Sequence, residues 1–190
     1  MNIARLAIVP LLLWSGAGVA ADYHTALLGF LDTSIRGWSA DPALVQAILA
    51  ANADRAAFDQ TMIDAADTAW RAEVGQADMP TITPVLNNPA ADVLRGQVDG
   101  SGGKITEAFI TDALGLNVAV SAPTSDMWQG DEDKFTAVFP AGAEGVLIGE
   151  VELDESTQAY QAQISISIVD PATGKAIGTL TVGVNADALM

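Results

Sequence analysis

Apolar residues recur at helical spacing through residues 22–75, a pattern that predicts three helices in this part of the chain. Asp41 and Pro42 form a typical helix start, because the carboxylate caps free N–H groups and proline fits the first helical position. Gly75 is expected to end the third helix. Two aromatic residues of this region are expected to pack in the core, Trp38 and Trp70.

Residues 76–103 have a different character, because three prolines interrupt any long element. One short helix is expected at residues 90–97, and the glycine-rich residues 99–103 are expected to form a flexible turn. We interpret this region as the connection from the helices to a sheet, rather than as a linker between independent domains.

From residue 104 the pattern alternates, which is the period of a β-strand. The clearest strand is predicted at residues 160–169, where every second residue from Tyr160 to Ile168 is apolar. Short connections between strands favour antiparallel pairing. We therefore expect an α+β fold, with N-terminal helices (residues 22–103) packed on a five-to-six-stranded antiparallel sheet (residues 104–190) in one domain. Strands are predicted at residues 105–111, 116–121, 146–154, 160–169 and 176–184.

The first 21 residues have the composition of a signal peptide. Arg5 supplies the positive charge, and residues 6–14 form an apolar stretch that is short for a membrane span. The small residues that follow predict cleavage near Ala20 or Ala21, and no cysteine is present for lipid attachment. We expect a periplasmic or secreted protein. An uncleaved membrane anchor is the alternative.

Charge and composition narrow the function classes. A net charge of −16 with only eight lysines and arginines argues against nucleic-acid binding. The absence of cysteine removes thiolate zinc sites, disulfides and thiol nucleophiles, and a single histidine, His24, argues against a Ser-His-Asp triad. No glycine-rich phosphate loop follows a strand and opens a helix. We therefore expect no enzyme activity and no cofactor.

One loop between predicted strands carries the candidate chemistry. Residues 124–133 set a tryptophan and a glycine among four acidic residues, and residues 131–139 are expected to include a turn or two of helix. The face of an aromatic ring attracts a cation, and a carboxylate adds a charge-assisted hydrogen bond. Trp128 with Asp126 and Asp154 would bind a small amine if the fold brings them together.

Other interpretations of the same residues remain open. Asp126, Asp131, Glu132 and Asp133 offer oxygen ligands that suit Ca²⁺, although their spacing is not that of an EF-hand. Acidic residues beside a helix start also favour the helix dipole and cap its first turn without any ligand. Trp128 and Tyr160 could pack in the core, and Asp154 could simply follow a strand.

The β region resembles the Cache/PDC sensor family, the ligand-binding domains of bacterial chemoreceptors and sensor kinases. The residues that carry the resemblance begin with a strand that ends at Asp112, a turn, and the run Gly-Leu-Asn-Val-Ala-Val-Ser at residues 115–121. The Trp128 loop follows, and Gly-Lys-Ala-Ile-Gly with Thr-Leu-Thr-Val-Gly-Val at residues 174–184 closes the domain. The resemblance covers residues 105–189 and is greatest to exported single-domain members.

The resemblance also implies a ligand site. In the amino-acid-binding branch, an Arg-x-Trp-Tyr run precedes an aspartate at a strand end, and the arginine holds the ligand carboxylate. Trp128 matches the tryptophan and Asp154 the amine-binding aspartate, whereas Asp126 replaces the arginine and Gln129 the tyrosine. The carboxylate clamp is therefore missing, which turns the expected ligand toward an amine-like cation or a neutral molecule. The predicted ligand-binding residues are Asp126, Trp128, Gln129, Asp131, Asp154 and Tyr160, with no metal ligand among them.

The predicted function is thus that of a small-molecule-binding sensor domain that signals through a membrane receptor or kinase. The family resemblance adds a homodimer through the N-terminal helix as an expected arrangement. An interaction or structural module that keeps the fold without a ligand is the alternative, together with the Ca²⁺-binding domain considered above.

Overall fold

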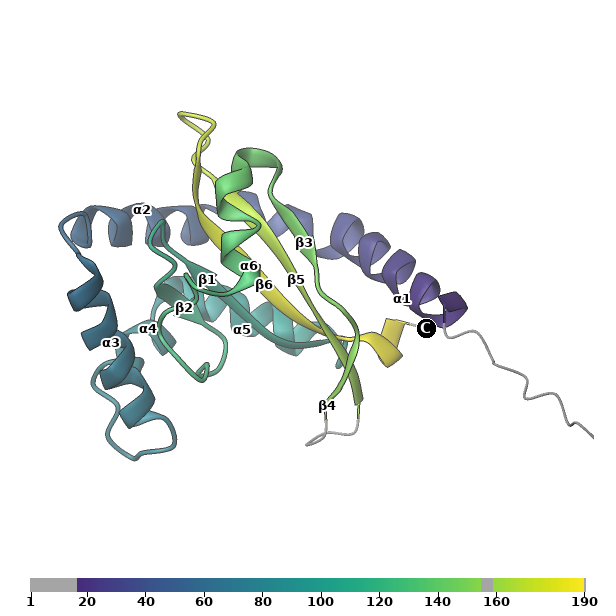
Figure 1. The fold of residues 1–190 in the computed structure, drawn as a ribbon, viewed down its shortest axis with the longest axis horizontal. Coiled ribbons are helices and arrows are strands. Elements are labelled where there is room, and N and C mark those ends of the chain that lie inside the picture. The colour runs from purple at the N-terminus through teal and green to yellow at the C-terminus, as the bar shows by residue number, and fades with distance from the viewer. Residues whose placement is uncertain (1–16, 155–158, 190) are drawn as a thin grey trace, which may run out of the picture.

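The computed structural model describes residues 17–154 and 159–189, and its fold is drawn in Figure 1. Most of the predicted signal peptide, residues 1–16, lies outside the described residues. The first described helix is α1, Ala17–Phe30. Among the described helices, none combines the length and the apolar character needed to cross a membrane.

The three predicted helical segments are confirmed. Helix α1 continues into a π-helical turn at Leu31–Ile35 and a 3-10 helix at Arg36–Ala40. Helix α2, Pro42–Asp54, begins as expected, because the carboxylate of Asp41 accepts the N–H of Ala43 at 2.8 Å. Helix α3, Gln60–Glu73, is capped in the same way by Asp59.

The connection to the sheet contains one helix that the sequence did not predict. Three prolines suggested a broken segment, yet α4, Ile82–Leu86, forms there, followed by α5, Pro89–Gly100. A carboxylate distant from α4 explains its stability, since Glu73 accepts the N–H groups of Thr81 and Ile82 at 2.8 and 3.0 Å. These are free donors at the start of a helix, and satisfying them stabilises the first turn.

The sheet is antiparallel, with strand order β2-β1-β6-β5-β3 and β4 paired with β5. The prediction of one strand at residues 146–154 was wrong, because two strands form there. Ile148 pairs with Ile164 and Glu152 with Gln161, so one side of the pairing holds an extra residue and the strand is broken at a bulge. The strands are β1 (Ile105–Thr111), β2 (Asn117–Val120), β3 (Val146–Ile148), β4 (Glu152–Asp154), β5 (Ala159–Val169) and β6 (Ala176–Asn185).

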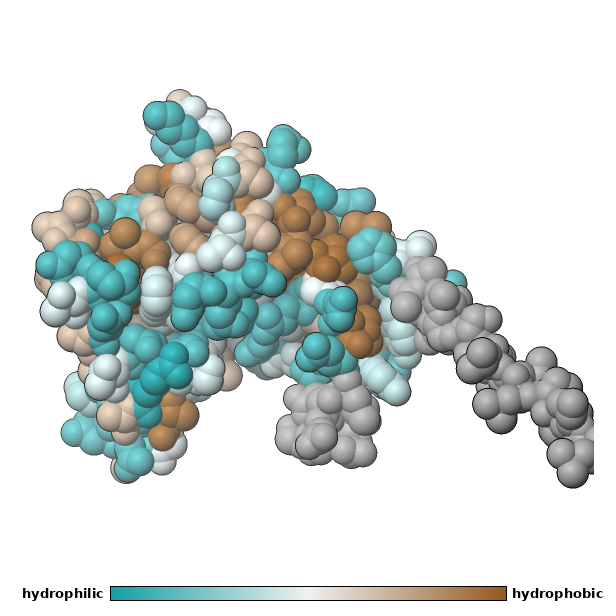
Figure 2. Space-filling model, viewed as in Figure 1, coloured by the Kyte–Doolittle hydropathy of each residue, from teal (hydrophilic) through white to brown (hydrophobic). Residues whose placement is uncertain are grey.

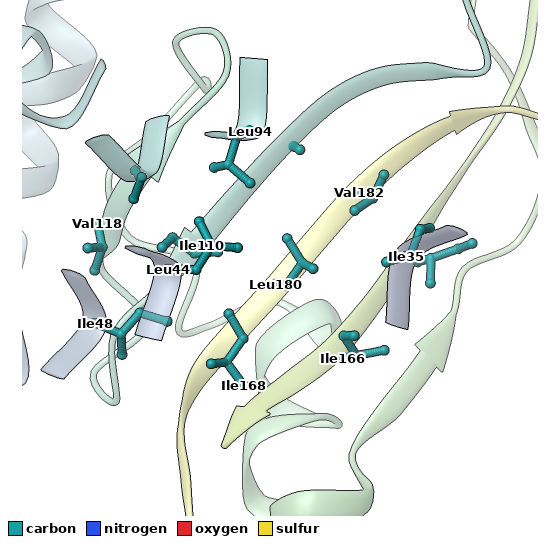
Figure 3. Close-up of a cluster of buried hydrophobic side chains, with 14 of the residues drawn as sticks. Ile35, Leu44, Ile48, Leu94, Ile110, Val118, Ile166, Ile168, Leu180 and Val182 are labelled. Carbon is teal, nitrogen blue, oxygen red and sulfur yellow. The ribbon is translucent and has the colours of Figure 1, made fainter. Parts of the chain in front are cut away.

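One face of the sheet is apolar and is covered by the helices, which confirms the predicted α+β class. Figure 3 shows side chains of β1, β5 and β6 meeting those of the helical segments across this core. Tyr160 starts the alternating strand but does not join the core, because its side chain is 43% exposed and its ring lies beside Tyr23. Core residues labelled in the figure include Ile35, Leu44, Ile48, Leu94, Ile110, Leu180 and Val182.

A second apolar cluster joins α3 and α4 to β1 and β2. Trp70 is fully buried in it, and its Nε1–H donates to the carbonyl of Thr124 at 2.9 Å. Trp38 is partly buried and packs against the first core. The predicted packing roles of both tryptophans are therefore confirmed. The buried members of the second cluster are Ile63, Trp70, Ile82, Val85, Phe109, Leu116, Val120 and Met127.

The turn between β1 and β2 is built around a buried carboxylate. Asp112 has a fully buried side chain, and its Oδ2 lies 2.7 Å from Nη1 of Arg55. Its Oδ1 accepts two backbone N–H groups of the turn at 2.9 and 3.0 Å. Gly115 follows with φ of 80°, and a Cβ there would lie 2.5 Å from Cα of Gly130. The turn therefore fixes where the loop of residues 124–133 crosses it.

Replacing Glu73 with glutamine tests the support of α4. Burial acts to raise the pKa of Glu73, but the hydrogen bonds from Thr81 and Ile82 outweigh it and lower that pKa. The ionised form therefore stabilises the fold above the ordinary carboxyl pKa of about 4.3, and this contribution disappears as pH falls through the lowered value. We expect Glu73→Gln to lower the melting temperature at neutral pH, with the difference from the native protein closing in acid.

The exposed Glu144 provides the control for that measurement, and Glu144→Gln should match the native melting temperature at both pH values. A melting-temperature difference for Glu73→Gln that stays constant from neutral to acidic pH would contradict the assignment.

Candidate functional site

The second face of the sheet is polar, and only part of it is covered. Helix α6, Asp133–Thr136, and the 3-10 turns at Phe139–Glu144 lie over one half, where Ser167 donates to the carbonyl of Val138 at 3.3 Å. Figure 1 shows α6 in front of the sheet, and Figure 2 shows hydrophilic residues gathered in the middle of this face. The other half is open and forms a hollow of about 430 Å³.

The floor of the hollow is a row of three residues across neighbouring strands. Glu107 of β1 and Gln163 of β5 both pair with Gly183 of β6, so their side chains point to the same face. Gly183 has no side chain, and a Cβ there would lie 2.7 Å from Cγ of Glu107. The glycine therefore gives the hollow its depth. The rim is formed by Glu132, Lys134, Gly149, Glu150 and Glu152.

The lining carries an excess of negative charge, from four glutamates and one lysine. Lys134 already pairs with Glu132, at 3.0 Å. Gln163 donates to Glu107 at 3.2 Å, which leaves the charge of that carboxylate in place. Within residues 17–154 and 159–189, no ion pair reaches Glu107, Glu150 or Glu152. The hollow is therefore suited to a cation.

The loop of residues 124–133 runs along the outer edge of β2. Asn117 donates its N–H to the carbonyl of Met127 at 2.9 Å, and Gln129 donates its N–H to the carbonyl of Gly115 at 2.8 Å. Trp128 forms a bridge with Leu116 between these bonds. The loop thus satisfies backbone groups that would otherwise be free at this edge of the sheet.

Helix α3 holds the loop through one carboxylate. Oδ1 of Asp67 accepts the N–H groups of Met127 and Trp128 at 2.9 and 3.1 Å, and its Oδ2 lies 2.7 Å from Nε of Arg71. The hydrogen bond to Asp67 raises the pKa of Arg71, and the charge of Asp126 acts in the same direction. Arg71 therefore stays charged between two carboxylates.

Two of the predicted site residues are buried inside the loop. The carboxylate of Asp126 accepts from Arg71 at 3.2 Å and from the side-chain amide of Gln129. Gln129 is 1% exposed, and its Oε1 accepts from Lys134 at 3.1 Å. A continuous chain of polar contacts therefore runs from Arg71 through Asp126 and Gln129 to Lys134 at the hollow.

Trp128 packs within the protein rather than lining the hollow. Its ring is half-buried against the second apolar cluster, and its Nε1–H donates to the carbonyl of Leu114 at 2.9 Å. A Cβ at Gly130 would lie 2.2 Å from that Nε1, so the glycine is needed for the ring to lie this close to the loop. Of the two interpretations of Trp128, this geometry corresponds to packing.

The remaining predicted site residues lie apart from the loop core. Asp131 is exposed. The backbone of Asp154 pairs with Ala159 between β4 and β5, and the N–H of Tyr160 donates to Asp187 at 3.2 Å. Since β1 and β6 separate β2 from β5, the sheet order keeps Asp154 and Tyr160 away from Asp126, Trp128 and Gln129.

Sequence reasoning missed the glutamates of the hollow. Glu107 was the available signal in β1, because it is the one charged residue of that strand. Glu150 and Glu152 had no local signal, since the bulge that turns this segment toward the hollow was not predicted. For the Ca²⁺ alternative, the described residues contain no group of three or more histidine, aspartate or glutamate side chains that could hold a metal ion.

Comparison with known proteins gives structural matches only. No protein-family model matches the sequence, and no curated protein matches it. The fold is similar to the sensor domain of the V. cholerae histidine kinase DctB, with a TM-score of 0.45 and 13% identity, over 91% of this chain and 55% of that chain.

Two chemoreceptor domains match the fold of this chain with comparable TM-scores. The ligand-binding domain of the Pseudomonas aeruginosa PAO1 amino acid chemoreceptor PctC, in complex with GABA, gives a TM-score of 0.46 at 13% identity, over 92% of this chain and 59% of that one. The domain of the Campylobacter jejuni chemoreceptor Tlp3 in complex with 4-methylisoleucine gives 0.42 at 15%, over 88% and 61%. The chain thus spans 55–61% of the length of these chains. All three are sensor or ligand-binding domains.

Removing the carboxylate of Asp67 tests how the loop is held. We expect Asp67→Ala to lower the free energy of unfolding by about 1–3 kcal/mol, because two backbone N–H groups lose their acceptor and Arg71 loses one of its two carboxylate partners. Urea denaturation measures the change. Asp64 lies on the same helix, is exposed and bonds only to Gln60 among the described residues, so Asp64→Ala is the matched control. Equal losses in both variants would show that Asp67 does not anchor the loop.

Proposed function

We propose that this protein is a small-molecule-binding sensor domain whose ligand is an amine-like cation bound in the hollow on the polar face of the sheet. The proposal is carried by the charge of the lining, in which Glu107, Glu150 and Glu152 have no ion-pair partner among the described residues. A volume of about 430 Å³ falls in the range of small-molecule sites. A carboxylate that binds an ammonium group contributes a charge-assisted hydrogen bond.

The residues of the hollow have distinct roles in this proposal. Glu107 binds the cationic group at the floor, where Gly183 leaves room for it. Glu150 and Glu152 attract the cation at the rim. Asp126 and Gln129, predicted as direct ligand contacts, act here through Lys134, which they help to hold at the edge of the site.

The cellular setting belongs to the same proposal. Residues 1–21 act as a signal peptide, and residues 22–190 form one exported domain that works in the periplasm or outside the cell. Ligand binding is reported to a membrane receptor or kinase, as the Cache/PDC resemblance of the sequence implies. A homodimer through α1 is supported by Leu28, an apolar residue of that helix that is 40% exposed.

An interaction module without a ligand is the second candidate, and one observation favours it. Two of the predicted ligand-binding residues are occupied with internal contacts, since Asp126 is paired to Arg71 and Trp128 is bonded to Leu114. The two candidates differ in whether the hollow binds amines.

Calorimetric titration with n-butylammonium chloride tests the proposed function. We expect saturable binding to the native protein, and no binding of sodium butyrate, which has a similar chain and the opposite charge. Glu107→Gln should weaken amine binding about tenfold or more, because a hydrogen bond to a charged group contributes about 1.5–3 kcal/mol.

Glu144→Gln removes an equal charge from an exposed position away from the hollow, so it should leave the affinity unchanged within about twofold. Equal weakening by the two variants would indicate non-specific attraction to an acidic surface. The absence of amine binding at millimolar concentration would reject the proposed site in favour of the interaction module.

A further inference from the structure

Lys134 is the one basic residue among the described residues that line the hollow. Its side chain is 14% exposed, so it lies within the wall of the site rather than reaching into solvent. Phe109, Thr181 and Ser165 form the row of the sheet next to the row of Glu107. The ammonium of Lys134 lies over the ring of Phe109, so it occupies the end of the hollow nearest this row.

Three groups surround this ammonium. The carboxylate of Glu132 lies 3.0 Å from Nζ, Oε1 of Gln129 lies 3.1 Å from it, and the ring centroid of Phe109 lies 5.5 Å from it. A negative charge, a neutral acceptor and an aromatic face are the set that binds a free ammonium group in a protein. Lys134 thus fills a complete ammonium site with its own side chain.

The site is held in place by groups other than Lys134. The carboxylate of Asp126 can only accept hydrogen bonds, so the amide nitrogen of Gln129 must face it and the oxygen must face Lys134. Arg71 in turn fixes Asp126 from the other side. Phe109 is 1% exposed and belongs to the second apolar cluster. Removing the ammonium of Lys134 would therefore leave the surrounding acceptors in position.

We propose that Lys134 is a specificity-determining residue that limits the hollow to ligands with a single cationic group. This inference rests on the proposed function for its ligand. Glu107, Glu150 and Glu152 remain for the cationic group of the ligand, whereas a second ammonium at the other end would meet the charge of Lys134. Like charges at short range repel, and the repulsion grows as water is excluded. The native hollow accordingly selects monoamines over linear diamines.

The selectivity is tested by titrating the native protein and Lys134→Met with linear diamines from propane to hexane and with the matching monoamines. Methionine keeps an unbranched apolar side chain and removes the ammonium. In the native protein each diamine should bind no tighter than its monoamine, because its second ammonium meets the charge of Lys134. In Lys134→Met at least one diamine should bind about tenfold tighter than its monoamine. Lys175→Met, at an exposed hairpin position, should keep the native ratio.

The ratio of diamine affinity to monoamine affinity also distinguishes a failure of the specificity role from a failure of the proposed function. If monoamines bind and the diamine ratio is the same in the native protein and in Lys134→Met, the specificity role is overturned and the proposed function stands. A native preference for diamines would overturn the specificity role as well.

A second measurement does not depend on a ligand for the native protein. Lys134→Ala removes the three outer methylene groups and the ammonium of the side chain, and n-propylammonium has the same three carbons and charge. Added n-propylammonium chloride should therefore raise the melting temperature of this variant more than that of the native protein. Sodium chloride at equal concentration is the control for ionic strength. If no amine binds the native protein but n-propylammonium still stabilises the variant, the ammonium site around Lys134 is supported and the proposed ligand class of the hollow is wrong. Without rescue, the inference is overturned.

Discussion

The geometry around the hollow depends on the buried carboxylate of Asp112. A fully buried carboxylate is costly unless it is paired and hydrogen-bonded, and Arg55 with two backbone N–H groups meets this requirement. The same contacts hold the β1–β2 turn in the shape that brings Gly115 against Gly130. The close approach of these two glycines fixes the path of the loop of residues 124–133. That path places Gln129 so that its side chain faces Lys134.

Local patterns were sufficient to predict most of the secondary structure. The caps at Asp41 and the alternation in β5 act over a few residues, so they can be found without knowing the fold. The break between β3 and β4 was missed because it reflects a register change against β5 rather than a feature of its own sequence. Helix α4 was missed for a similar reason, since the acceptor for its first N–H groups, Glu73, lies outside the segment.

The candidate site could not be predicted in the same way. An aspartate beside a tryptophan has the same local composition whether it binds a ligand or is neutralised internally, and the partner that decides, Arg71, lies 55 residues from Asp126. Glu107 becomes part of a site only when the register sets it beside Gly183. The cationic ligand inferred from Asp126, Trp128 and Asp154 therefore has the same sign as the one favoured by the hollow, but different residues account for it. The shared sign follows from the general excess of acidic residues in this chain.

The broken strand at residues 149–151 also bears on how this protein behaves in a crowded solution. A long, regular edge strand offers its free N–H and C=O groups to other chains and promotes aggregation. Here β3 has only three residues before the bulge, and glutamates follow it at positions 150 and 152. At the opposite edge the loop already bonds to β2. The bulge that turns acidic residues toward the hollow thus also disfavours pairing of this edge strand with strands of other molecules.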